Sequence, residues 1–192
     1  MESLLVSTGA VALAEIGDKT QLLAFLLAAR FRKPLPIVSG ILVATVVNHG
    51  FAGALGAWII HVVPPEVLRW ALGLSFTGMA AWTLVPDRIE EELAGVAPRL
   101  GIFGATLIAF FLAEMGDKTQ VATVALAVHY AAPVTIVFGT TLGMLIADVP
   151  AVFVGRKLAD RIPMRLVHGV AAAVFASLGL ATLLGFDPGT GP

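Results

Sequence analysis

The sequence predicts an all-α membrane protein in which six transmembrane helices form two inverted three-helix repeats. Three observations predict this fold class: an apolar composition, long apolar stretches separated by charged or proline-containing breaks, and an eight-residue motif that occurs twice. Hydrophobic residues make up 58% of the 192 residues and charged residues 13%, and the mean hydropathy is +0.92. Soluble domains carry about 25% charged residues. A chain of this length also has too little interior to keep so much apolar surface from water.

The apolar stretches account for the six helices in chain order. A bilayer core requires roughly 20 apolar residues per helix. The stretches are Leu4–Ala29, Leu35–Ile60, Val67–Val85, Gly101–Val128, Val134–Gly155 and Leu166–Phe186. Proline or clustered charge fills each break, at 30–34, 63–66, 86–99, 131–133 and 156–165. We therefore expect two three-helix units, 1–86 and 100–192, joined by a linker of residues 87–99.

The linker is acidic. It contains Asp87, Glu90, Glu91 and Glu92. A run of like charges indicates a solvated segment, and a regulatory cation sensor is the alternative.

An internal repeat relates the two units. The segment Ala14–Gln21 recurs 99 residues later as Ala113–Gln120, with seven identities in eight positions. Pro34 and Pro133 match at the same offset. Because three helices are an odd number, the second unit must enter the membrane from the opposite side, as in the inverted repeats of secondary transporters.

Basic residues predict the orientation. Nine of them lie in the breaks on one side: Arg30, Arg32, Lys33, Arg88, Arg99, Arg156, Lys157, Arg161 and Arg165. The opposite side holds Arg69. Since basic loops stay in the cytoplasm, we expect a multi-pass plasma-membrane protein with both termini outside and the acidic linker inside.

Charged side chains inside the predicted helices indicate a functional site. Five carboxylates lie there: Glu15, Asp18, Glu114, Asp117 and Asp148. Each costs about 2.5–3.5 kcal/mol at a helix centre, so such groups are functional candidates by default. The alternative is structural pairing of Glu15 with Lys19, and of Glu114 with Lys118, four residues apart on one helix. That alternative leaves the three aspartates without a lysine.

The spacing of these carboxylates predicts a metal site. Glu15 and Asp18 share one helical face, and twofold symmetry would bring them near Glu114 and Asp117 at the midplane. Oxygen clusters suit hard divalent cations. Further oxygens are available on Thr20, Gln21, Thr119 and Gln120. A straight helix would turn Thr20 away from Glu15, so the glycine between them marks either local unwinding or close helix packing.

The second helix of each unit adds one polar position that differs between the units. His49 aligns with Asp148 at the repeat offset. His49 could be a metal ligand, a proton carrier or a hydrogen-bonded structural histidine, and these three alternatives stay open. With five carboxylates and two lysines, the metal-free cluster carries a formal charge of −3. We expect it to hold at least one proton, which an arriving cation would expel.

The doubled motif resembles a known family. Glu15–Thr20 and Glu114–Thr119 match the Glu-x-Gly-Asp-(Lys/Arg)-(Ser/Thr) signature of the small Ca²⁺/Mn²⁺:H⁺ antiporter family. This family is also called the calcium:cation antiporter-2 family or uncharacterised protein family 0016, and it includes a human Golgi transporter and bacterial manganese exporters. The resemblance implies cation binding by Glu15, Asp18, Glu114 and Asp117, and proton-driven export of Mn²⁺ or Ca²⁺. The short linker favours a prokaryotic member, and Mn²⁺ is the favoured substrate.

Other function classes are less compatible with the sequence. No lysine- or arginine-rich cluster indicates a nucleic-acid partner, and we expect neither a cofactor nor enzymatic activity. A passive divalent-cation channel would carry rings of acids at a pore mouth. An intramembrane aspartyl protease is suggested by Ile16-Gly17-Asp18 and its copy, but a lysine beside each aspartate opposes the shared proton of such a dyad.

Overall fold

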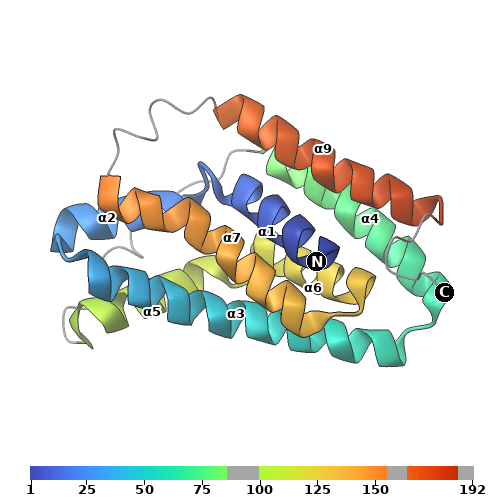
Figure 1. The fold of residues 1–192 in the computed structure, drawn as a ribbon, viewed down its shortest axis with the longest axis horizontal. Helices are drawn as coiled ribbons and strands as arrows, with labels where there is room; N and C mark the ends of the chain where they lie inside the picture. The colour runs from blue at the N-terminus through green and yellow to red at the C-terminus, as the bar shows by residue number, and fades with distance from the viewer. Residues whose placement is uncertain (86–99, 155–163, 186–192) are drawn as a thin grey trace.

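The computed structural model describes residues 1–85, 100–154 and 164–185, and the regular elements of these residues are helices (Figure 1). The first half contains α1 (Glu2–Glu15), α2 (Lys19–Phe31), α3 (Pro34–Val62) and α4 (Pro65–Thr83). The second half contains α5 (Gly101–Glu114), α6 (Lys118–Tyr130), α7 (Pro133–Val154) and α9 (Met164–Leu183). The predicted acidic linker and the basic residues Arg88, Arg99, Arg156, Lys157 and Arg161 lie outside the described residues.

Each of the six apolar stretches is helical, but two of them are divided. The expected continuous helix over Leu4–Ala29 is wrong, because α1 ends at Glu15 and α2 begins at Lys19. The expected helix over Gly101–Val128 is divided between α5 and α6 in the same way. Glu15 and Asp18 therefore do not share the face of one continuous helix.

The helix ends follow from local sequence. α3 and α4 both begin with proline in their first turn, where the missing N–H removes no helical hydrogen bond. Between α2 and α3 the chain turns through Arg32, which has a left-handed φ of 51°. Ala131 has φ 48° at the corresponding place between α6 and α7. The two halves thus turn in the same way at matching positions.

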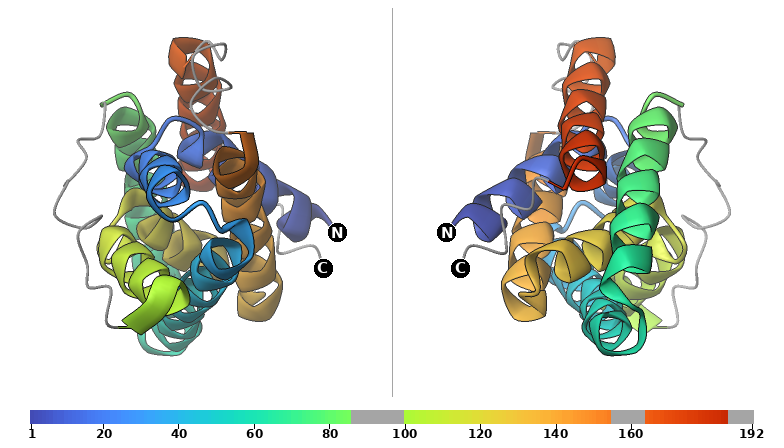
Figure 2. Two further views of the ribbon diagram at one scale, coloured as in Figure 1. Left: turned by 90° about the vertical axis from the view of Figure 1, so that its left-hand side faces the viewer. Right: turned by 90° about the vertical axis from the view of Figure 1, so that its right-hand side faces the viewer.

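The two halves interlock. α1 and α2 pack against α7 of the other half, and α5 and α6 pack against α3. Matching helices run in opposite directions along the long axis of the molecule, since α3 runs from left to right in Figure 1 and α7 from right to left. α4 and α9 pack against each other along one side of the bundle, as both views of Figure 2 show.

Glycines bring the interlocked helices together at repeat-related places. A Cβ at Gly40 of α3 would lie 2.9 Å from the Phe103 carbonyl oxygen of α5. A Cβ at Gly139 of α7 would lie 3.1 Å from the Leu4 carbonyl oxygen of α1. Leu4 and Phe103 are themselves separated by the repeat offset, so the same helix contact is built twice.

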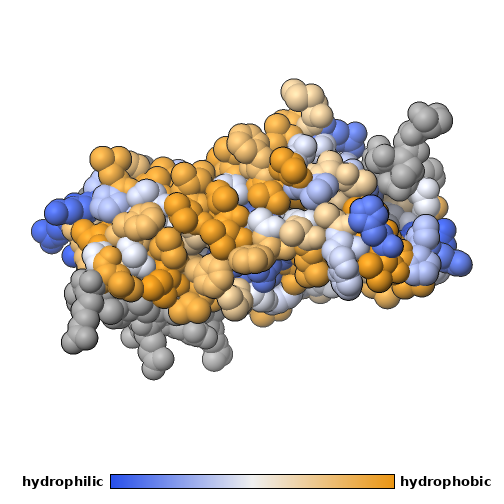
Figure 3. Space-filling view, turned by 90° about the horizontal axis from the view of Figure 1, so that it is seen from below, coloured by the Kyte–Doolittle hydropathy of each residue, from blue (hydrophilic) through white to orange (hydrophobic). Residues whose placement is uncertain are grey.

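The surface of the bundle is compatible with a lipid environment. Three described helical segments are long and apolar enough to cross a membrane: Pro34–Val62, Pro133–Phe153 and Arg165–Leu183. Large apolar side chains of α3, including Val47 and Phe51, are exposed. Figure 3 shows apolar side chains over the middle of the face that includes α3, with hydrophilic ones mainly toward the two ends.

Candidate metal centre

The repeated motif forms the two helix breaks. Gly17 and Gly116 have φ of 87° and 75°, a left-handed conformation that costs other L-residues about 1–2 kcal/mol. A Cβ at Gly116 would meet no atom within 4 Å. Gly116 is therefore required for the turn and not for close helix packing. Local unwinding, one of the two roles predicted for these glycines, is the one the structure supports.

The breaks place three carboxylates together in the interior. Glu15 and Glu114 end α1 and α5, and Asp117 precedes α6. One oxygen from each of these three side chains lies within 4.8 Å of the others, and all three residues are buried. Asp18, the fourth predicted ligand, is also buried but does not belong to this close group.

Each of the three carboxylates has one oxygen held by a neighbouring donor: a threonine for each glutamate, and Lys19 for Asp117. Thr20 donates its hydroxyl hydrogen to Glu15 Oε2 at 2.6 Å, and Thr119 donates to Glu114 Oε2 at 2.9 Å. These bonds exist because the break turns each threonine back toward its glutamate. The other oxygens, Oε1 of both glutamates and Oδ2 of Asp117, accept no hydrogen bond from the described residues. The three side chains can therefore each offer one oxygen to a cation.

The motif lysines pair across the two halves. Lys19 Nζ lies 2.8 Å from Asp117 Oδ1, and Lys118 Nζ lies 2.9 Å from Asp18 Oδ1. The alternative of lysine–glutamate pairs within one helix is wrong, because each lysine pairs with an aspartate of the other half. Because the helix is broken, a lysine four residues after the glutamate no longer lies beside it.

The cross-half pairs also settle which charges remain uncompensated. Two lysines offset two aspartates, which leaves Glu15, Glu114 and Asp148 as formal negative charges among the five buried carboxylates. The two pairs differ in burial, because the side chain of Lys19 is 25% exposed and that of Lys118 is 3% exposed.

The two motif glutamines support the breaks. Gln21 Oε1 accepts a hydrogen bond from the Gly17 N–H at 2.9 Å, and its amide donates to the Ala147 carbonyl of α7. Gln120 Oε1 accepts from the Gly116 N–H at 2.8 Å. In this arrangement both amide oxygens are directed to the backbone. Their predicted role as additional ligands stays a prediction.

His49 and Asp148 are fully buried at matching positions of α3 and α7. Neither ring nitrogen of His49 and neither oxygen of Asp148 has a hydrogen-bond partner among the described residues. The alternative of a hydrogen-bonded structural histidine therefore receives no support. Buried polar groups without partners are costly, which keeps both residues as candidates for ligand or proton-carrying roles.

Two contributions were not expected from the sequence. Asn48 Nδ2 donates to the Phe111 carbonyl of α5 at 3.1 Å, and the Gln120 amide reaches Asn48 Oδ1 at 3.5 Å. His168 of α9 lies with Nε2 3.0 Å from the carbonyl oxygen of Ile16, which the break of α1 leaves without a helical partner. The position of Asn48 beside His49 marked it as a polar residue of this helix, but no sequence signal indicated its partners or the contact of His168.

Comparison with known proteins assigns the chain to a family. The family described as "Divalent cation/proton antiporter GDT1" matches residues 3–91 and 102–187. The chain belongs to this family. The predicted resemblance is thereby confirmed, and the interruption between the two matched segments falls near the linker between the repeats.

Relatives from bacteria and plants cover nearly the whole chain. A Vibrio cholerae protein named "Putative manganese exporter" is 48% identical over 183 residues, which are 95% of this chain and 90% of that protein. An Arabidopsis thaliana protein named "GDT1-like protein 3" is 30% identical over 94% of this chain and 70% of its own length. No solved structure matches the chain.

Membership in an antiporter family agrees with the site geometry. Asp18 and Asp117 are each held by a lysine of the other half, whereas an aspartyl protease needs two aspartates that share a proton. The ion pair of each aspartate with a lysine opposes such a shared proton.

Proposed function

We propose that the chain exports a divalent cation, Mn²⁺ in preference to Ca²⁺, from the cytoplasm in exchange for protons. The observation that carries this proposal is the group formed by Glu15, Glu114 and Asp117, each with one buried oxygen that accepts no hydrogen bond from the described residues. Hard divalent cations take such oxygens as ligands. The 48% identity to a protein named as a manganese exporter supports Mn²⁺ as the cargo.

In this proposal all four motif carboxylates take part in binding. Glu15, Glu114 and Asp117 supply the first oxygens, and Asp18 completes the set when its lysine moves away. Thr20 and Thr119 fix the glutamate orientations through their hydrogen bonds. Asp148, and His49 at the matching position, are candidates for holding the proton.

Charge competition couples the metal to protons. Uncompensated carboxylates in a low-dielectric interior are costly, so the empty cluster takes up protons and the cation replaces them. Protons arriving from outside then displace the cation there. No covalent intermediate and no cofactor is required for this exchange.

Alternating access requires two halves that can move relative to each other. We propose six membrane spans in two inverted repeats, with α1–α2 and α5–α6 as discontinuous spans. The opposed directions of matching helices in Figure 1 support this arrangement. Arg30, Arg32 and Lys33 at the turn between α2 and α3 support a cytoplasmic location for that end, which leaves both termini outside.

Reconstituted protein tests the proposal directly. Vesicles with an acidic interior should accumulate Mn²⁺ against its gradient while their interior loses protons. Glu15→Gln and Glu114→Gln should abolish accumulation, and Glu66→Gln, which changes an exposed glutamate of α4, should leave it intact. Mn²⁺ entry that only equilibrates the metal, at a rate unaffected by the pH difference, would instead identify a channel.

A further inference from the structure

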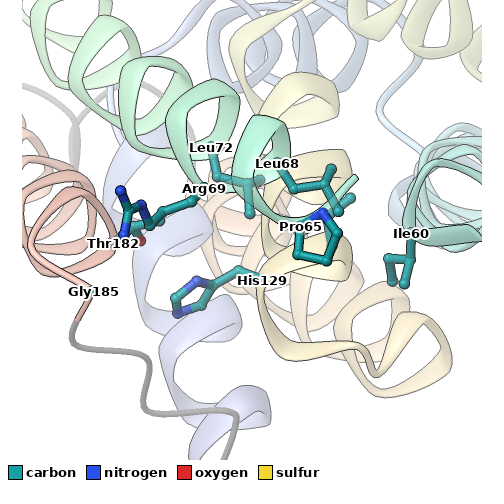
Figure 4. A pocket seen from close by; sticks show the side chains of 9 residues that line it. Ile60, Pro65, Leu68, Arg69, Leu72, His129, Thr182 and Gly185 are labelled. Atoms are coloured by element: carbon teal, nitrogen blue, oxygen red, sulfur yellow. The ribbon is translucent and has the colours of Figure 1, made fainter. Parts of the chain in front are cut away.

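A pocket of about 340 Å³ lies at the end of the bundle where α3 turns into α4. Arg69 of α4, His129 of α6 and Thr182 of α9 are its polar residues, and Ile60, Leu68 and Leu72 contribute apolar walls. Figure 4 shows Arg69 close to Thr182 and Gly185, with His129 facing the same space. His129 lies near the end of α6 opposite to the motif residue Lys118, and the pocket has no role in the proposed transport.

A second, apolar groove adjoins this pocket. It has a volume of about 310 Å³ and shares Leu68, Leu72 and Val128 with the first pocket. It continues along α4 to Ser75, which lies about 10 Å beyond Leu68 at 1.5 Å per residue. The combined space therefore has a cationic end and an apolar extension.

Exposed tryptophans near the cationic end indicate the depth of bilayer headgroups. Trp58, two residues before Ile60, and Trp70, next to Arg69, are exposed at 59% and 51%. Tryptophan concentrates at membrane–water interfaces. The Arg69 guanidinium lies 5.7 Å from the centre of the Trp70 ring. Arg69 forms no ion pair with a carboxylate of the described residues, so its charge is available to a ligand.

We propose that this pocket and groove bind one anionic phospholipid, with the phosphate on Arg69 and an acyl chain in the groove. A guanidinium presents paired donors that fit phosphate oxygens. Thr182 already donates its hydroxyl to the Leu178 carbonyl, and the Arg69 guanidinium, with its paired donors, is the principal partner for the phosphate, with His129 facing the same space. Because the pocket and the groove share Leu68, Leu72 and Val128, one molecule can place its headgroup in the pocket and an acyl chain in the groove.

Lipid retention by the full chain tests this proposal. Protein purified from mixed phosphatidylglycerol and phosphatidylcholine micelles should carry mainly phosphatidylglycerol in native mass spectrometry. Arg69→Gln should lower this preference about tenfold, the value of one charge-assisted hydrogen-bonded contact. Arg69→Lys should retain part of it. Arg30→Gln is the matched control, because Arg30 also lies over a neighbouring aromatic ring, at 5.3 Å, and should leave the preference unchanged.

Two results would overturn the proposal. The first is an undiminished preference for phosphatidylglycerol in Arg69→Gln. If that variant also has a lowered unfolding temperature, Arg69 instead stabilises the end of α9. The second is displacement of the bound lipid by millimolar glycerol phosphate, since it would identify an anion site that does not use the groove.

Discussion

The two cross-half ion pairs should contribute unequally to stability, although the same two motif positions form both pairs. Lys118 is 3% exposed and its partner Asp18 is fully buried, whereas Lys19 is 25% exposed. Removing one member of a buried pair leaves an uncompensated charge and costs about 3–5 kcal/mol, and exposed pairs contribute about 0–1 kcal/mol. We therefore expect Lys118→Gln to lower the free energy of unfolding by about 3 kcal/mol or more, and Lys19→Gln by clearly less.

Denaturant unfolding of the purified protein in detergent measures this difference. A second substitution separates the lost pair from the orphaned charge, because Asp18→Asn in the Lys118→Gln background removes the uncompensated carboxylate. That double variant should recover most of the lost stability. Equal losses in the two lysine variants, or no recovery in the double variant, would refute the reasoning.

Five further substitutions, at four positions, test individual backbone conformations and contacts. Gly116→Ala should destabilise the protein by about 1–2 kcal/mol through its φ of 75° alone. Gly116→Asn should cost less. Equal thermal unfolding midpoints for the two variants and the unmodified protein would contradict this. Gly40→Ala should destabilise the protein by about 1–3 kcal/mol, because the added Cβ would clash with α5. Gly78→Ala should instead stabilise helix α4 by about 0.5–1 kcal/mol, because its Cβ meets no atom within 4 Å. Thr119→Val should weaken Mn²⁺ binding several-fold in calorimetry by freeing Glu114, and unchanged affinity would exclude that role.

Much of the fold could be predicted from local sequence. The apolar stretches, their proline-marked ends and the repeat are properties of neighbouring residues, and the helices follow them closely. The sequence also offered unwinding at Gly17 as one of two alternatives, because a straight helix would turn Thr20 away from Glu15. The bond of 2.6 Å from Thr20 to Glu15 favours the unwinding alternative.

The partners of the lysines could not be read in this way. A one-dimensional pattern shows Glu15 four residues before Lys19, and helical geometry then favours that pair. The observed partner, Asp117, is distant in sequence and comes close only because α1 and α2 pack into the other half. The contact of His168 with Ile16 has the same origin, since it depends on how α9 lies over α1.

The charge of the cluster leads to a prediction about stoichiometry. After the lysines are counted, five buried carboxylates leave a formal charge of −3. Three protons neutralise that charge, and so do one divalent cation and one proton. Exchange of one metal ion for two protons therefore keeps the cluster neutral in both states, and it avoids the cost of moving net charge through a low-dielectric interior. We expect Mn²⁺ uptake into vesicles at a fixed pH difference to be unchanged by a potassium diffusion potential of either sign. A rate that rises with one sign of the potential would show that another number of protons is exchanged.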